Sequence, residues 1–233
     1  MQFGIILKMV TTLLIDLDNT LVDFNKCAEY AMRTYFPKFG LEYKENMIDI
    51  FIKTNDSLWK KIEKGELTKN RLREIRWNLV FENLGLSGDG PAFEEIFENS
   101  IANTAFPVDG AEDILKYLSE KYTLCIVTNG FEKVQTNRMK ISGFDRFFKH
   151  IFISEKIGHQ KPSKEFFDGC FSELGNPKKD DVVLIGDSLS ADIKGGVSYG
   201  IKTVWFDRKG ETPSSENTPD YTVHSLEEIK NIL

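Results

Sequence analysis

The stretch Leu13-Leu14-Ile15-Asp16-Leu17-Asp18-Asn19-Thr20-Leu21 decides how this chain is interpreted. Its apolar start is typical of a buried strand, and two aspartates spaced i, i+2 follow. Residues with this spacing on a strand point to the same side, so we expect Asp16 and Asp18 to project together from the carboxyl end of the strand. Ligands bind at that end in open α/β sheets. Two carboxylates so close are costly unless a divalent cation, or a proton held by one of them, offsets their charge.

The pattern of the remaining sequence divides the chain near residue 105. From about Asn25 to Asn103 the sequence indicates helices only, interrupted at glycine and proline positions. From Pro107 onward, strands and helices alternate, which implies a parallel sheet with right-handed crossovers. The expected strands after the first are Tyr122–Thr128, His150–Ile153, Val182–Ile185 and Thr203–Trp205. The expected helices are Asn25–Phe36, Lys44–Lys61, Thr68–Leu84, Pro91–Asn103, Asp109–Glu120, Glu132–Ser142, Ser163–Leu174 and Ala191–Tyr199.

These elements predict an α/β fold with two domains. Residues 1–22 and 105–233 form the core, a Rossmann-like doubly wound parallel sheet with helices. Residues 23–104 form an all-helical cap domain inserted after the first strand, where it is well placed to cover a site at the sheet edge. Near the end of the chain, Asp207–Pro219 is expected to be a surface loop, and Ser225–Glu228 has the pattern of a capping box that opens a last helix.

Composition narrows the class of protein. The 233 residues are 41% hydrophobic and 28% charged, as in ordinary globular proteins. The net charge of −6, with no block of lysine and arginine, argues against a nucleic-acid polymer as the main partner. Lys8 interrupts the apolar start and no cleavage-site pattern follows, which argues against a signal peptide. Together with three widely spaced cysteines, this predicts a cytoplasmic protein with reduced, buried thiols and no membrane association.

Three further motifs lie at the ends of expected strands or at the start of a helix. They are Thr128-Asn129-Gly130, Lys161-Pro162, and Gly186-Asp187-Ser188 with Asp192 shortly beyond. Taken singly, each has an ordinary structural explanation as a turn, a cap, a loop or an exposed lysine. Taken together and in this order, the four motifs resemble those of the haloacid dehalogenase superfamily of aspartate-nucleophile phosphotransferases. The resemblance extends over the whole chain, including the helical insertion.

This resemblance implies that Asp16 is a nucleophile that forms an acyl-phosphate, because the nucleophile stands first in the motif. Asp18 would protonate the leaving oxygen and later take a proton from the hydrolytic water. The presence of Asp18 favours phosphate chemistry over carbon–halogen cleavage, since the dehalogenases of the superfamily have no aspartate at this position. Thr128 would donate its hydroxyl to phosphate oxygens, and so would the backbone amides of Asn129 and Gly130.

The same resemblance implies Mg²⁺ as the cofactor. Asp16 and Asp187 would supply carboxylate ligands, the backbone carbonyl of Asp18 a third oxygen, and Asp192 a ligand or a hold on metal-bound water. Lys161 would offset the charge of the aspartates and of the transition state, and it would also contact the phosphate.

The substrate class is more open. The stretches 16–24, 76–78, 128–131, 153–158 and 161–162 are similar to those of pyrimidine 5′-nucleotidases, which implies hydrolysis of nucleoside 5′-monophosphates. The N-acylneuraminate 9-phosphatases and other sugar-phosphate phosphatases are also similar. A phosphomutase and a non-enzymatic binding protein of the same fold are further alternatives, although no motif is damaged as the latter would require.

Aromatic residues of the expected cap are candidates for stacking on a base. Tyr30, Phe51, Trp59 and Trp77 lie within the helical region, and the apolar pattern around Tyr30, Phe36, Trp59 and Trp77 favours a place in a helical core. Phe24 directly follows the first motif and is therefore our candidate for contact with the substrate.

Overall fold

The computed structural model describes residues 10–208, 210, 212–213 and 217–233. Its centre is a sheet with the strand order β3-β2-β1-β4-β5-β6, in which all neighbouring strands are parallel. This is a doubly wound arrangement, and the order reverses between β1 and β4, where ligands bind in such sheets. The expected fold class is confirmed. The strands are β1 (Thr12–Ile15), β2 (Thr123–Thr128), β3 (His150–Ile153), β4 (Val182–Gly186), β5 (Lys202–Phe206) and β6 (Tyr221–Val223).

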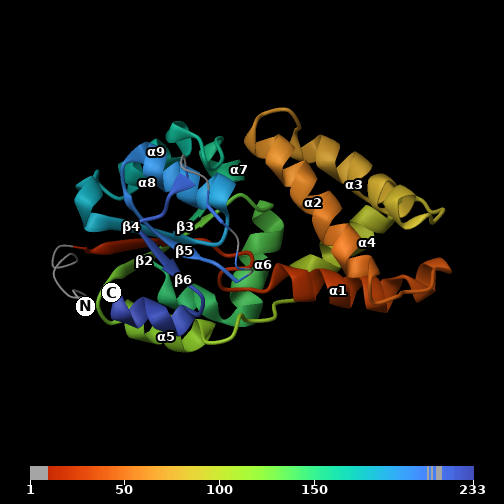
Figure 1. The fold of residues 1–233 in the computed structure, drawn as a ribbon, viewed down its shortest axis with the longest axis horizontal. Coiled ribbons are helices and arrows are strands. Elements are labelled where there is room, and N and C mark those ends of the chain that lie inside the picture. Colours follow the sequence, from red (N-terminus) through yellow and green to blue (C-terminus); the bar gives the residue numbers. More distant parts are fainter. Residues whose placement is uncertain (1–9, 209, 211, 214–216) are drawn as a thin grey trace. The chain divides into compact units, whose positions relative to one another are not determined.

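Helices cover both faces of this sheet, with α8 and α9 on one face and α5 on the other (Figure 1). One face is packed with phenylalanines of α8 against apolar residues of β1, β2 and β4, including Leu14 and Leu184. The helices of this part are α5 (Ala111–Ser119), α6 (Glu132–Ser142), α7 (Ser154–Ile157), α8 (Lys164–Glu173) and α9 (Lys194–Tyr199). Burial of the central strands on both faces explains why their sequences are continuous apolar runs.

The chain separates into two compact units. One consists of the chain up to Asp23 together with Pro107–Leu233, and the other of Phe24–Phe106. In the first unit, Val22 pairs with Pro107 in an antiparallel bridge, and Val108 N donates to Leu21 O at 2.9 Å. The chain segments that leave and re-enter the sheet unit therefore run side by side.

The second unit is helical and consists of α1 (Phe24–Tyr35), α2 (Met47–Glu63), α3 (Lys69–Leu84) and α4 (Gly90–Ala102). Its core is built around the buried Trp77, whose ring centroid lies 4.4 Å from that of Phe93 and 5.0 Å from that of Phe97. The same interior holds an ion pair, in which the buried Arg76 donates to Glu94 and to Asn55 Oδ1. No helix among the described residues is both long and apolar enough to cross a bilayer.

Several details of the predicted elements were wrong. The short edge strand β6 and the single turn α7 were not expected. The predicted helix Ala191–Tyr199 instead begins with a π-helical turn, Leu189–Ile193, before α9. Of the predicted loop Asp207–Pro219, residues 209, 211 and 214–216 lie outside the described residues.

The expected capping box is only half formed. Residues Leu226–Asn231 form a 3₁₀ helix with Ser225 as its N-cap, and the Glu228 carboxylate accepts the backbone N–H of His224 at 3.0 Å. Ser225 Oγ makes no cap bond and donates instead to the Glu228 carboxylate at 3.2 Å. Among the aromatic residues expected in the core, Phe36 and Trp77 are fully buried, but Tyr30 is 46% exposed and packs edge-on against Phe106.

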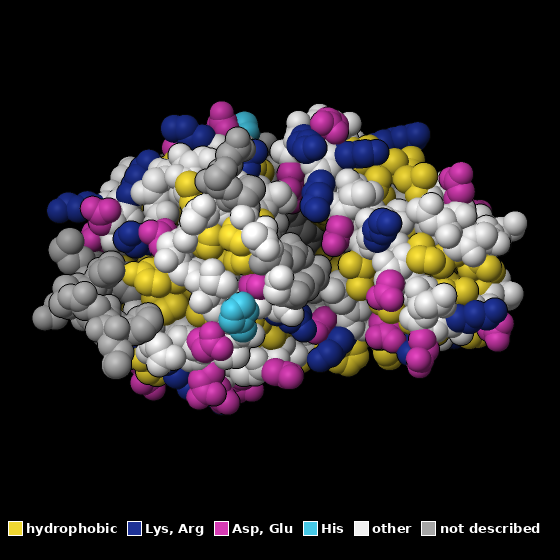
Figure 2. All heavy atoms as spheres, in the orientation of Figure 1, with side chains coloured by type: hydrophobic (Ala, Val, Ile, Leu, Met, Phe, Trp, Pro, Cys, Tyr) yellow, Lys and Arg dark blue, Asp and Glu magenta, His cyan; other side chains and the backbone are white. Residues whose placement is uncertain are grey.

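Charged side chains of both signs are interspersed on the face shown in Figure 2.

Candidate active site

Asp16 lies at the point where the strand order reverses. It follows β1 directly, and its backbone N–H still donates to Ile185 O of β4 at 2.9 Å. Its buried carboxylate accepts a hydrogen bond from Lys161, whose Nζ lies 2.7 Å from Asp16 Oδ1. Lys161 Nζ also donates at 2.7 Å to Asp192 Oδ1 and to Val127 O. An ammonium has three donors, so these three bonds fix the position of the lysine head.

Three carboxylates converge beside this lysine. Asp16, Asp187 and Asp192 each offer an oxygen, and the three oxygens all lie within 4.8 Å of one another. They come from the carboxyl ends of β1 and β4 and from the turn that follows β4. Hard oxygen ligands in such a cluster are the donors that Mg²⁺ prefers, so the residues fit the ion that the sequence implies.

The electrostatics of the cluster also call for a cation. Burial raises the pKa of Asp16 to about 7, with help from the charges of Asp192 and Asp18 and against the effect of Lys161. Burial likewise raises the pKa of Asp187 well above its usual value, with Asp16 and Asp192 adding to the effect. Burial opposes the charge of Lys161, but Asp16 and Asp192 more than offset this, so its pKa is raised. The lysine is therefore a permanent cation, and its single charge faces three aspartates.

Asn129 positions this lysine through the backbone. Asn129 Nδ2 donates to Lys161 O and Lys161 N donates to Asn129 Oδ1, both at 2.9 Å. The peptide bond between Lys161 and Pro162 is cis. The sequence suggested only that the backbone amide of Asn129 binds phosphate, and it gave no sign that the side chain holds the loop of Lys161.

Thr20 and Trp205 also contact the aspartates of the site. The buried Thr20 hydroxyl lies 3.2 Å from Asp16 Oδ2 and 3.4 Å from Asp187 Oδ1. Trp205 Nε1, on the neighbouring strand β5, donates to Asp187 O at 2.9 Å. Thr20 belongs to the first motif and could be selected from the sequence. The contact of Trp205 with Asp187 could not be predicted in this way, because it arises only when β4 pairs with β5.

The turn after β4 holds Asp192, which is fully buried. Ser188 N donates to Asp192 Oδ2 at 3.1 Å, while Lys161 occupies the other oxygen. Gly186 makes room for this side chain, since a Cβ at position 186 would lie 2.3 Å from Asp192 Oδ2.

Gly186→Ala is therefore expected to displace Asp192 from Lys161 and to lower the free energy of unfolding by about 1–3 kcal/mol, the usual cost of overpacking. Urea denaturation followed by circular dichroism measures this loss. Ser190→Ala is the matched control, because Ser190 lies in the same turn with its hydroxyl 3.4 Å from Ser188 Oγ. Equal stability of the two variants would contradict the assigned role of Gly186.

Asp18 lies apart from the three-carboxylate cluster. Its side chain is 31% exposed, and both of its oxygens accept hydrogen bonds from α6, from Gln135 and Arg138. Sequence reasoning missed these two residues. The available signal was their spacing, because Gln135 and Arg138 share a stripe with the apolar Val134 and Met139 on the face that α6 buries.

The other predicted site residues are placed as follows. Thr128 ends β2 with a buried hydroxyl, which accepts the N–H of Gly130 at 3.1 Å. Phe24 belongs to the helical unit, where it is half-buried and its ring centroid lies 6.3 Å from that of Phe51.

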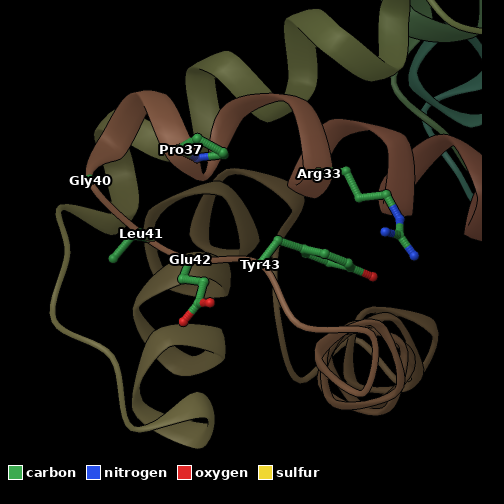
Figure 3. A pocket seen from close by; sticks show the side chains of 6 residues that line it. All are labelled: Arg33, Pro37, Gly40, Leu41, Glu42 and Tyr43. Atoms are coloured by element: carbon green, nitrogen blue, oxygen red, sulfur yellow. The ribbon is translucent and has the colours of Figure 1, made fainter.

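A depression of about 640 Å³ on the helical unit, drawn in Figure 3, includes none of the predicted site residues. Within it, the Arg33 guanidinium lies over the Tyr43 ring, 4.6 Å from the centroid. Its lining residues are Arg33, Pro37, Gly40, Leu41, Glu42 and Tyr43.

Comparison with known proteins identifies the family. The model of the haloacid dehalogenase-like hydrolases matches residues 13–206. The chain belongs to the haloacid dehalogenase-like hydrolase family. Among its relatives in this family, the HAD-hydrolase YfnB of Bacillus subtilis (strain 168) is 34% identical over 97% of both chains.

Two other relatives in the family have named activities. The pyrimidine 5′-nucleotidase PynA of Streptococcus pneumoniae is 32% identical, over 95% of this chain and 96% of PynA. The pyrimidine 5′-nucleotidase YjjG of Escherichia coli is 28% identical, over 94% and 95%. A crystal structure of YfnB, described as bound to magnesium and as revealing interdomain movement, superimposes with a TM-score of 0.90 and covers 97% of this chain and 99% of YfnB. This hydrolase of the haloacid dehalogenase-like family therefore shares its architecture with a magnesium-binding relative.

Proposed function

We propose that the protein is a Mg²⁺-dependent phosphomonoester hydrolase that acts through an aspartyl-phosphate on Asp16, with nucleoside 5′-monophosphates as its substrates. The observation that carries this proposal is the convergence of Asp16, Asp187 and Asp192 within 4.8 Å beside the buried Lys161. Three carboxylates beside one lysine leave an excess of negative charge and supply hard oxygen donors. Such a site is suited to a divalent cation and to the phosphate that accompanies it.

In the first step, an Asp16 oxygen attacks phosphorus and a new P–O bond forms, while the bond from phosphorus to the substrate oxygen breaks. Asp18 gives its proton to the departing oxygen, which leaves as an alcohol. Lys161 holds Asp16 through Oδ1 at 2.7 Å, so the direction of the carboxylate is set before substrate arrives. Thr128 donates its hydroxyl to a phosphoryl oxygen.

In the second step, Asp18 takes a proton from water, and the water oxygen bonds to phosphorus as the bond to Asp16 breaks. Inorganic phosphate is released, and both aspartates return to their starting states. Mg²⁺, held by Asp16, Asp187, Asp192 and the backbone carbonyl of Asp18, would offset the charge of the phosphoryl oxygens when bound.

The substrate class is supported by the two pyrimidine 5′-nucleotidase relatives, PynA and YjjG. An N-acylneuraminate-9-phosphatase of Mus musculus is 26% identical over 97% of this chain and favours sugar phosphates as the second candidate. A phosphomutase would hand the phosphoryl group to a sugar hydroxyl instead of water. In each case the partner is a small phosphate ester, rather than a polymer or a membrane. We also propose a cytoplasmic location, consistent with three buried cysteines, Cys27, Cys125 and Cys170, that are not joined in disulfides.

Phosphate release from a panel of esters tests this function. The panel holds purine and pyrimidine 5′-monophosphates, their deoxy forms, and sugar phosphates, each with Mg²⁺ and with EDTA. We expect release from pyrimidine 5′-monophosphates that depends on Mg²⁺ and stops with EDTA. Phosphate release from sugar phosphates alone would show that the substrates are sugar phosphates instead of nucleoside 5′-monophosphates. Release from none of them, with Mg²⁺ present, would contradict the proposed hydrolase.

A further inference from the structure

Two polar residues of α6, Gln135 and Arg138, have only 1% of their surface exposed. They are spaced i, i+3, so they lie on the same face of the helix, and both donate to the carboxylate of Asp18. Arg138 Nη1 donates to Asp18 Oδ1, and Gln135 Nε2 donates to Asp18 Oδ2 at 2.6 Å. A buried arginine is expensive unless it is paired, and here its partner is the residue to which we assign the acid and base role.

The two helix residues also hold each other. Arg138 Nη1 donates to Gln135 Oε1 at 3.2 Å. This bond fixes which way the Gln135 amide faces, because the reversed amide would place its oxygen against the Asp18 carboxylate and its NH₂ against the guanidinium. The hydrogen-bond donors around Asp18 therefore have a single arrangement. The Asp18 side chain is 31% exposed, so substrate and water can still reach it.

The Gln135 amide links Asp18 to Thr128. Gln135 Nε2 lies 2.8 Å from Thr128 Oγ1, and Gly130 N donates to the same oxygen at 3.1 Å. A hydroxyl has two acceptor sites and one donor. Because two N–H groups fill the acceptor sites, the Thr128 hydrogen must point elsewhere, which makes this hydroxyl a donor to phosphate.

The position of Gln135 depends on the absence of a side chain at position 130. A Cβ on Gly130 would lie 2.3 Å from Gln135 Nε2 and 2.5 Å from its Cδ. Since the amide is held by Asp18, Thr128 and Arg138, it has no freedom to move aside without losing those bonds. The glycine of the second motif thus serves the amide as well as the phosphate.

We propose that Gln135 and Arg138 form a clamp that positions Asp18 for proton transfer and, through Gln135, aligns it with the phosphate-binding hydroxyl of Thr128. This inference rests on the proposed function. The two residues are positioning residues, since they act on the substrate through Asp18 and Thr128. The clamp explains why α6 buries a charged side chain and an amide at positions where apolar residues would pack.

The dependence of kcat/KM on the leaving group of the substrate distinguishes a role in positioning Asp18 from a merely structural role. An alkyl phosphate, such as a nucleoside 5′-monophosphate, needs its leaving oxygen protonated, whereas p-nitrophenyl phosphate releases a stable phenolate. The ratio kcat/KM reports the steps up to departure of the leaving group. It is measured with Mg²⁺ for both substrates in wild type, Asp18→Asn, Arg138→Met, Arg138→Lys and Gln135→Met.

We expect Asp18→Asn to lower kcat/KM for the alkyl phosphate by about 10²- to 10⁴-fold and to affect the aryl phosphate far less. Misplacement of Asp18 in Arg138→Met should lower the alkyl value by about 10- to 100-fold, again with a small effect on the aryl value. Arg138→Lys should restore part of the loss. Gln135→Met should show the same selectivity with some loss on both substrates, because Thr128 is also released.

The control is Arg146→Met, which removes an exposed arginine paired with Glu112 in the same unit and should leave both ratios unchanged. If Arg138→Met does not fold, Gln135→Met decides the question. Equal losses on the two substrates in the clamp variants, with a selective loss in Asp18→Asn, would overturn the clamp alone. A wild-type protein that hydrolyses neither ester would overturn the proposed function and the clamp with it.

Discussion

Asp16→Asn should give a folded protein that releases no phosphate. The asparagine has the size of the aspartate and keeps an acceptor for Lys161 Nζ, but an amide oxygen is too poor a nucleophile to form the acyl-phosphate. We expect turnover to fall by about 10⁴-fold or more, since nothing else in the mechanism replaces the nucleophile. Phosphate release under saturating Mg²⁺ measures the loss.

The same variant should not be less stable than wild type in the absence of metal. Burial raises the pKa of Asp16 to about 7, above its value in an unfolded chain, so ionised Asp16 disfavours the folded state at neutral pH. Asparagine removes that cost. Thermal unfolding with EDTA should show an unchanged or higher midpoint, and Mg²⁺ should raise the midpoint of wild type more than that of the variant. Substantial residual turnover would rule out Asp16 as the nucleophile.

Lys161→Met should be the most destabilising single change in the site. The lysine head is 2% exposed and donates to Asp16, Asp192 and Val127 O. Removing it leaves two buried carboxylates without their cation, and breaking a buried pair in this way costs about 3–5 kcal/mol. Urea denaturation with EDTA measures the loss, and phosphate release should disappear as well.

A double-mutant cycle tests the cause of that loss. In an Asp16→Asn background, fewer charges are left unpaired, so Lys161→Met should cost clearly less stability than it does in wild type. Lys164→Met is the control, because Lys164 is an exposed lysine that pairs with Asp168 on the surface of α8. An equal cost of Lys161→Met in both backgrounds would show that packing, rather than charge, explains the role of the lysine.

The parts of the site that lie at strand ends were predictable from the sequence. Apolar runs mark parallel strands, and the carboxyl ends of such strands meet at one edge, so Asp16, Thr128 and Asp187 could be assigned to one region of the sheet. The inserted unit was predictable as helical because its apolar periodicity is strong over α1 and α2. In both cases the local pattern and the fold agree.

The parts that depend on side-chain partners were not predictable. Nothing in the sequence indicates that the Asn129 side chain bonds the backbone of Lys161, because the loop between them closes only in the folded sheet. Gln135 and Arg138 were not singled out, because their place on the buried stripe of α6 does not reveal that their partner is Asp18, which is distant in the sequence. The edge strand β6 escaped notice because three residues are too few to show a pattern.

The strand order also determines when each strand can find its neighbour during synthesis of the chain. The first strand to leave the ribosome, β1, is central in the sheet, and its neighbours β2 and β4 begin only at Thr123 and Val182. The helical unit, Phe24–Phe106, is contiguous and is complete before either neighbour is synthesised. Domains generally fold as units during synthesis, so the inserted unit is positioned to fold first. Asp16 therefore follows an apolar strand that has no partner until Thr123–Thr128 has emerged, and an unpaired apolar strand of this kind is exposed to aggregation in the nascent protein.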